Sequence, residues 1–167
     1  QAFIQLLPRL YPARRVAVLG FTYLEHAACW STAAAVETVE TIDALGAADV
    51  AVIVNPNNPD GRLLSPGELA PLAAEMTRKG GLLVLDESFM DFTPAQSAVA
   101  LARQEGVIVL RSFGKAYGLA GLRLGFALAS PARAAMLRTA LKVRRERDTE
   151  ALGPFVVWIW VVPFATQ

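Results

Sequence analysis

The sequence predicts an α/β fold, a three-layer sandwich in which helices cover both faces of a mostly parallel sheet. Short apolar runs rich in β-branched residues alternate along the chain with segments of helical periodicity, which is typical of parallel sheets buried on both faces. Apolar residues make up 54% of the 167 residues and charged residues 19%. Such a chain can bury a substantial core and is not disordered.

The first part of the chain supplies five predicted elements. Apolar residues recur with helical spacing over residues 3–10, which predicts an amphipathic helix. Residues 16–19 and 51–54 are short apolar runs, each followed by turn residues, and they predict buried strands. Small residues over 27–35 favour a helix, and 36–41 favours a short strand.

The best-marked helix begins after Ser65. Pro66 suits the first helical position, and Glu68 stands three residues after the serine, which together predict an N-cap with a capping box. Gly80 and Gly81 end the helix.

The remaining elements continue the alternation. Residues 82–85, 107–110 and 122–128 predict strands, and 95–104 and 131–147 predict helices. The chain therefore has several strands whose carboxyl ends are expected to meet at one edge of the sheet, where ligands gather in such folds.

Polar residues follow three of the predicted strands. Asn58 comes after one strand, Asp86 after the next, and Ser112 with Lys115 after a third. Lys115 stands among glycines and small apolar residues with few carboxylates nearby in sequence. A site of this kind can desolvate an amine and lower its pKa, and such lysines form Schiff bases.

These residues match the needs of pyridoxal phosphate. The cofactor requires an amine, and it requires a carboxylate that keeps the pyridine nitrogen protonated so that the ring can accept electrons. It also needs a donor for the ring hydroxyl, and hydroxyl groups and cations for the phosphate. Arg123, eight residues after Lys115, is the candidate cation. We therefore expect one pocket that binds pyridoxal phosphate, and no metal.

Four motifs in order resemble the class I/II aminotransferase family of fold-type I pyridoxal-phosphate enzymes, over about residues 1–141. They span 55–61 (NPNNPDG), 85–92 (LDESFMDF), 111–115 (RSFGK) and 121–126 (GLRLGF). The chain is accordingly expected to be the large domain of such an enzyme.

The resemblance implies a role for each candidate residue. Lys115 carries the Schiff base and later moves the proton, and Asp86 pairs with the pyridinium nitrogen, so both are expected to be catalytic. Asn58 hydrogen-bonds the ring hydroxyl and Tyr23 stacks on the ring face. The phosphate is expected to be held by Ser112 and Arg123.

We expect three further residues to be structural only: His26, Glu87 and Arg111. A single histidine on a helix edge is usually a satisfied or exposed side chain.

Departures from the family pattern narrow the expected activity. Phe89 replaces a tyrosine that reaches the ring oxygen, Gly114 replaces a serine that binds phosphate, and Asp60 replaces a threonine. Within the superfamily, Phe89 and the Ser-Phe-Gly-Lys sequence are most similar to threonine-phosphate decarboxylases of cobalamin biosynthesis. Histidinol-phosphate aminotransferase is the alternative.

The chain is shorter than the family it resembles, whose members have roughly twice its length. We expect residues 1–141 to be a partial large domain without the upstream phosphate loop, and 142–167 to be an atypical tail with no small domain. A truncated, non-catalytic remnant that at most binds cofactor is therefore a further possibility. A P-loop nucleotide site is excluded, because no Ser or Thr follows Gly114-Lys115 and the earlier glycine is missing.

Charge and composition indicate few other partners. The formal net charge of +1 gives no sign of nucleic-acid binding, and the apolar run 155–164 is too short to cross a bilayer. A single cysteine, Cys29, fits a reducing compartment, so we expect a cytoplasmic protein. The expected partner is a small amino acid or amino phosphate, and the resemblance implies a homodimer in the full-length form.

Overall fold

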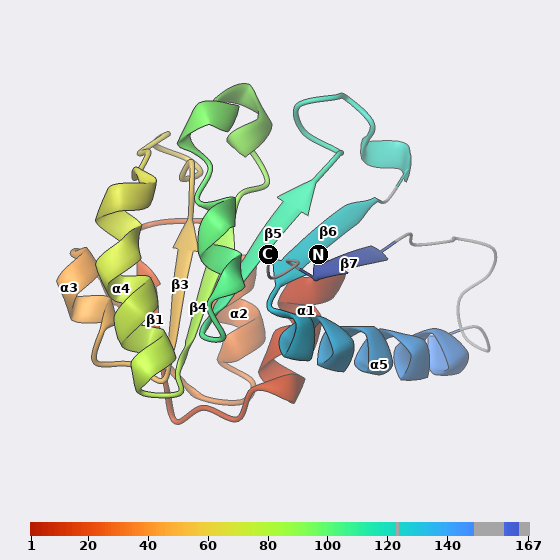
Figure 1. Ribbon diagram of the computed structural model, residues 1–167, viewed down its shortest axis with the longest axis horizontal. Helices are drawn as coiled ribbons and strands as arrows, with labels where there is room; N and C mark the ends of the chain where they lie inside the picture. The colour runs from red at the N-terminus through yellow and green to blue at the C-terminus, as the bar shows by residue number, and fades with distance from the viewer. Residues whose placement is uncertain (123, 149–158, 164–167) are drawn as a thin grey trace.

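The computed structural model describes residues 1–122, 124–148 and 159–163. Its centre is a seven-stranded sheet in the order β2-β1-β3-β4-β5-β6-β7 (Figure 1). The strands are β1 (Arg15–Leu19), β2 (Ala35–Val39), β3 (Val50–Val54), β4 (Leu82–Asp86), β5 (Val107–Ser112), β6 (Gly125–Ala129) and β7 (Ile159–Pro163).

The sheet is mostly parallel, as predicted. Neighbouring strands from β2 to β5 are parallel, β6 is antiparallel to β5, and β7 is parallel to β6. The carboxyl ends of β3, β4 and β5 therefore lie side by side, at the top of the sheet in Figure 1. This is the edge at which ligands were expected.

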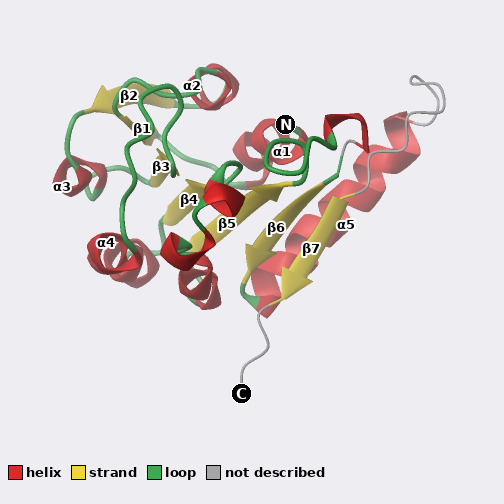
Figure 2. Cartoon of the chain, turned by 90° about the horizontal axis from the view of Figure 1, so that it is seen from above, coloured by secondary structure: helices red, strands yellow, loops and turns green. Residues whose placement is uncertain are grey.

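Helices cover both faces of the sheet (Figure 2). The α-helices are α1 (Ala2–Leu10), α2 (Glu25–Trp30), α3 (Ile42–Leu45), α4 (Pro66–Arg78) and α5 (Pro131–Asp148). Short 3₁₀ helices are η1 (Met90–Phe92), η2 (Pro94–Gln96), η3 (Val99–Arg103) and η4 (Ala120–Leu122). Val50 and Val52 pack in the cluster with α1, α2 and α5, whereas Ala51 and Ile53 pack in the cluster with α3, α4 and η3. This alternation confirms the three-layer arrangement.

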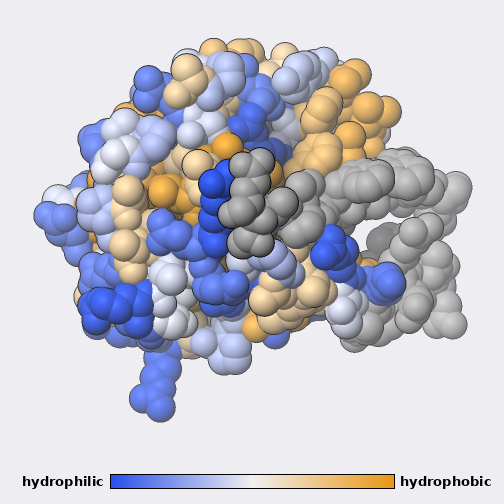
Figure 3. Space-filling model, viewed as in Figure 1, coloured by the Kyte–Doolittle hydropathy of each residue, from blue (hydrophilic) through white to orange (hydrophobic). Residues whose placement is uncertain are grey.

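Apolar side chains also reach the surface in the loop between β5 and β6. Tyr117, Leu119 and Leu122 are exposed there. In Figure 3, apolar colour gathers on the side of the molecule where this loop lies in Figure 1.

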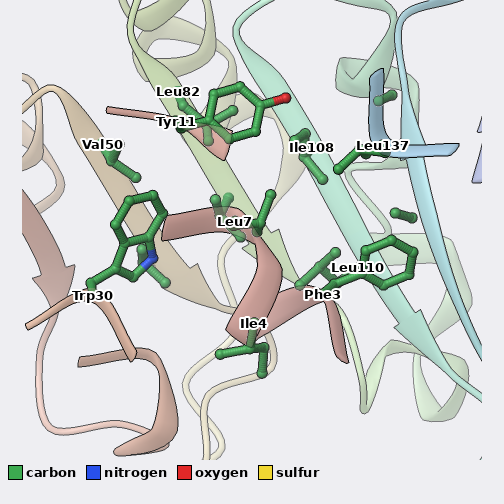
Figure 4. Close-up of a cluster of buried hydrophobic side chains, with 14 of the residues drawn as sticks. Phe3, Ile4, Leu7, Tyr11, Trp30, Val50, Leu82, Ile108, Leu110 and Leu137 are labelled. Atoms are coloured by element: carbon green, nitrogen blue, oxygen red, sulfur yellow. The ribbon is translucent and has the colours of Figure 1, made fainter. Parts of the chain in front are cut away.

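The core beside α1 is built from large side chains (Figure 4). Leu7 is completely buried and Trp30 is 1% exposed, and both pack in one cluster with Ile108 of β5 and Leu137 of α5. Because burying a large apolar side chain contributes about 1.5–3 kcal/mol, these contacts hold α1 firmly against the sheet. The first turn of α1 is thereby positioned at the sheet's carboxyl edge.

Helix α4 begins and ends where the sequence predicts. The backbone N–H of Ser65 donates to Glu68 Oε2 at 2.8 Å, and the Glu68 N–H donates to Ser65 Oγ at 3.3 Å, which forms the capping box. Gly80 follows the helix with φ of +73°, a left-handed conformation that favours glycine.

Three segments differ from the sequence prediction. The strand expected over 122–128 is found as β6 at Gly125–Ala129, and Leu122 belongs to η4 instead. The expected helix over 95–104 is wrong, because this segment forms the separate 3₁₀ helices η2 and η3. Between them, the buried carboxylate of Glu87 accepts hydrogen bonds from Ser97 Oγ and Ala98 N, both at 2.7 Å. Those bonds fix the chain in a bend that a continuous α-helix could not follow. The helix expected over 27–35 is found as α2 at Glu25–Trp30, and a turn follows it before β2 begins at Ala35.

The described part of the chain after residue 141 contains the end of α5 and the strand β7. Helix α5 continues to Asp148, and β7 extends the sheet by pairing with β6. Residues 155–158 and 164 of the apolar run lie outside the described residues. No helix in the described ranges is long and apolar enough to cross a membrane.

Candidate active site

A cavity of about 380 Å³ lies at the carboxyl edge of the sheet. Its lining includes the predicted site residues Tyr23, Asn58, Asp86, Ser112 and Lys115. The structure therefore brings together residues from the ends of four chain segments. Arg123, the remaining predicted residue, lies outside the described part of the chain.

The loops carrying Tyr23 and Asn58 are tied to each other. Asn57 Oδ1 accepts a hydrogen bond from Thr22 Oγ1 at 2.5 Å, and Asn57 Nδ2 donates to the carbonyl oxygen of Phe21 at 3.1 Å. Thr22 and Asn57 are buried, whereas their neighbours Tyr23 and Asn58 are exposed toward the cavity. The buried pair thus positions the two exposed residues.

Asp60 also belongs to this arrangement. Its Oδ1 accepts hydrogen bonds from Asn57 Nδ2 at 2.7 Å and from Arg62 N at 3.0 Å. The replacement of the family's threonine by Asp60 therefore supplies an acceptor that holds the loop.

Asp86 is the buried charge of the site. Its Oδ2 lies 2.9 Å from His26 Nε2, and its Oδ1 accepts from Ser88 N at 3.0 Å and Ser88 Oγ at 2.5 Å. Burial alone would raise the pKa of Asp86, but hydrogen bonding and electrostatic attraction by His26, with the bonds from Ser88, hold the pKa below its usual value. Because the carboxylate is ionised and can only accept, His26 Nε2 carries the hydrogen of their bond.

The assignment of His26 as only a structural residue was incomplete. His26 is fully buried and contacts the predicted catalytic carboxylate. A signal was available in the sequence: His26 follows Tyr23 by three residues, a spacing that places both side chains on one side of a helical turn. Their rings are 6.3 Å apart and nearly perpendicular.

Lys115 lines the cavity, but the surroundings of its side chain differ from those expected. Its side chain is exposed, so the expected desolvation by flanking small residues is wrong. The Nζ atom lies 5.4 Å from the ring centroid of Phe89, within the range of a cation–π interaction. The aromatic ring holds the amine at the cavity wall.

Ser112, the expected phosphate ligand, lines the cavity. Gln1 and Ala2 also line the cavity. Ser112 Oγ accepts a bond from Gly114 N at 3.2 Å. A Cβ at Gly114 would lie 3.2 Å from Ala120 Cα, so a serine there would require the loop to shift.

An ion-pair network below the cavity joins the ends of β4 and β5. Arg111 Nη1 donates to the buried Glu87 at 2.8 Å, and Nη2 pairs with Asp91. The prediction that Glu87 and Arg111 are structural fits these contacts. Arg111 also borders the cavity.

The residues present fit pyridoxal phosphate. The cavity lining includes an amine, an ionised carboxylate, an amide and a hydroxyl. The three hydrogen bonds to Asp86 leave one of about four acceptor positions free for a further donor. A group of three or more metal-ligating side chains does not occur among the described residues.

Solved structures with a similar fold include an aminotransferase and a decarboxylase. Histidinol-phosphate aminotransferase from Sinorhizobium meliloti, in complex with pyridoxal-5'-phosphate, superimposes with a TM-score of 0.72 at 24% identity, over 92% of this chain and 45% of that one. L-threonine-O-3-phosphate decarboxylase from Porphyromonas gingivalis gives a TM-score of 0.62 at 25% identity, over 72% of this chain and 39% of that one.

Curated sequences are more similar. Threonine-phosphate decarboxylase from Pseudomonas aeruginosa is 49% identical over 132 residues, 77% of this chain, and that from Sinorhizobium sp. is 52% identical over 134 residues, 78% of this chain. The chain spans only 40% of the length of each. The profile of the family "Aminotransferase class I and II" matches residues 3–147. With its fold, its cavity and this match, the chain belongs to the class I and II aminotransferase family, whose members are pyridoxal-phosphate-dependent enzymes.

Proposed function

We propose that this chain is the cofactor-binding part of a pyridoxal-phosphate-dependent enzyme that acts on an amino acid or amino phosphate. The observation that carries this proposal is the convergence of Lys115, Asp86, Asn58, Tyr23 and Ser112 on one cavity at the sheet edge. These residues are far apart in sequence, and the separate roles they could fill belong to a single cofactor.

Each residue has a distinct task in this proposal. Lys115 Nζ holds the cofactor covalently and later moves a proton at the substrate Cα, while Asp86 keeps the ring nitrogen protonated. Bound pyridoxal phosphate supplies an electron sink for the electrons released at Cα. Asn58 donates to the ring hydroxyl, and Tyr23 stacks on the ring.

The phosphate is bound by Ser112 and Arg123 in this proposal.

The reaction we favour is that of threonine-phosphate decarboxylase, in cobalamin biosynthesis. The support is identity of about one half with two such enzymes over three quarters of the chain. Histidinol-phosphate aminotransferase is the second candidate, because the enzyme from Shewanella amazonensis is 43% identical over 99 residues. The two reactions differ in which bond at Cα is aligned for cleavage, the bond to the carboxylate or the bond to hydrogen.

The cofactor site can be tested on this chain directly. The chain has three lysines, Lys79, Lys115 and Lys142. After incubation with pyridoxal phosphate and borohydride, we expect mass spectrometry to find the cofactor on the Lys115 peptide. The Lys115→Ala variant should lose this label, and Lys142→Ala, which removes an exposed lysine, should keep it. A folded chain that takes up no cofactor would instead support the non-catalytic remnant.

The reaction type requires the longer protein. With threonine phosphate we expect release of carbon dioxide. Transfer of the amino group of histidinol phosphate to an oxo acid, which converts the oxo acid to an amino acid and histidinol phosphate to a ketone without release of carbon dioxide, would favour the aminotransferase.

We further propose a cytoplasmic homodimer for the longer protein. Sedimentation velocity measures the oligomeric state, and a monomer at micromolar concentration would contradict the proposed homodimer.

A further inference from the structure

We propose that Ser88 is a positioning residue that holds Oδ1 of Asp86 and so leaves Oδ2 as the oxygen that receives the ring nitrogen of the cofactor. The inference rests on the proposed function and adds a residue to it. Ser88 borders the same cavity as Asp86 and is partly exposed, so its hydroxyl lies beside whatever binds there.

Counting acceptor positions on Asp86 leads to this assignment. An ionised carboxylate has about four lone-pair positions, two on each oxygen. Ser88 fills both positions of Oδ1, one through its backbone N–H at 3.0 Å and one through its hydroxyl at 2.5 Å. His26 Nε2 fills one position of Oδ2 at 2.9 Å. The remaining position is therefore on Oδ2.

The two supports of Asp86 come from different parts of the fold. His26 belongs to α2 and is 60 residues away in sequence, whereas Ser88 lies two residues after Asp86 in the loop that follows β4. Both oxygens of the Asp86 carboxylate therefore accept hydrogen bonds. The last torsion of an aspartate has a broad, roughly two-fold energy profile, so its orientation depends on such partners.

Removing the Ser88 hydroxyl leaves a second acceptor position of Asp86 unoccupied, while the backbone turn from Asp86 to Ser88 is kept. In Ser88→Ala the backbone N–H still donates to Oδ1, but one position of Oδ1 becomes free. A ring N–H can then meet either oxygen, and the carboxylate is less firmly oriented. Ser88→Thr keeps a hydroxyl at the same place.

The test compares two ligands on the full 167-residue chain. One is pyridoxal phosphate, and the other is its analogue with a C–H group in place of the ring nitrogen. We expect Ser88→Ala to weaken binding of pyridoxal phosphate about 3- to 10-fold, less than the loss of a direct hydrogen bond to a charged group, because the hydroxyl acts on the cofactor only through Asp86. Binding of the analogue should change less than about twofold, because it offers Asp86 no donor. Ser88→Thr should restore most of the affinity for pyridoxal phosphate.

Other results would overturn the inference. Equal weakening of both ligands would show that Ser88 only maintains the loop, and unchanged or tighter binding of pyridoxal phosphate would show that its hydroxyl does not orient Asp86.

A second measurement needs no cofactor. In a carbon-13 NMR titration of the cofactor-free chain, Ser88→Ala should raise the protonation midpoint of Asp86, and Ser88→Thr should not. An unchanged midpoint in Ser88→Ala would overturn the role of Ser88. If Ser88→Ala raises the protonation midpoint of Asp86 but the parent chain takes up no cofactor, the hydrogen bond from Ser88 to Asp86 would be supported and the proposed function contradicted.

Discussion

Replacing His26 by leucine should destabilise the domain by removing a donor from a buried charge. The side chains of His26 and Asp86 are 1% and 5% exposed, and their contact is 2.9 Å long. Hydrogen bonds to charged groups contribute about 1.5–3 kcal/mol, so we expect the free energy of unfolding to fall by about 2 kcal/mol at neutral pH. His26→Gln can place an amide donor near the position of Nε2 and should lose less than about 1 kcal/mol.

Urea denaturation of the two variants measures these losses, and a double-mutant cycle with Asp86→Asn isolates the contact. The pKa of Asp86 is lowered in the folded chain, so the stabilisation is complete above the unfolded pKa of about 3.9 and is lost as pH falls through the folded value. The difference between parent and His26→Leu should therefore be largest near neutral pH and shrink below about pH 4.

Two results would refute this reasoning. A coupling energy below about 0.5 kcal/mol in the cycle would mean that His26 does not stabilise the charge of Asp86. Equal losses in His26→Leu and His26→Gln would mean that the shape of the imidazole matters and its donor does not.

Two further substitutions, measured by denaturation, test the ion pairs of Arg111 and the packing of Gly106 against α4. Glu87→Ala should cost about 3 kcal/mol or more, because it leaves Arg111 with one carboxylate and removes the acceptor of the Ala98 N–H. Gly106→Ala should cost about 2 kcal/mol, since its Cβ would come within 2.6 Å of the backbone nitrogen of Thr77.

Each of these has a matched control. Glu87→Gln keeps one oxygen acceptor and should lose clearly less than Glu87→Ala; equal losses would contradict the ion-pair argument. Gly121→Ala adds a Cβ with no atom within 4 Å and should change stability by less than about 0.5 kcal/mol. A loss as large as that of Gly106→Ala would contradict the packing argument.

Local patterns predicted much of the fold correctly. The apolar runs that became β1, β3, β4 and β5 are continuous, as expected for strands buried on both faces. The start of α4 followed from Ser65 and Glu68, because a capping box involves only residues three apart. Information of this kind is contained in a few neighbouring residues.

The same holds for the site. Asp86 and Ser112 are the last residues of β4 and β5, so the parallel order of the strands was enough to predict that they meet. The order of the motifs along the chain then indicated the family and its cofactor.

The tertiary structure decided what depends on distant residues. The sequence does not show that the side chain of His26 reaches Asp86, 60 residues away, or that Glu87 holds the bend at Ala98. The small neighbours of Lys115 indicated a site that can desolvate its amine, yet the fold leaves that side chain exposed beside Phe89. The physical reason is common to these cases: burial and hydrogen-bond partners are set by packing between elements, whereas periodicity and caps are set within them.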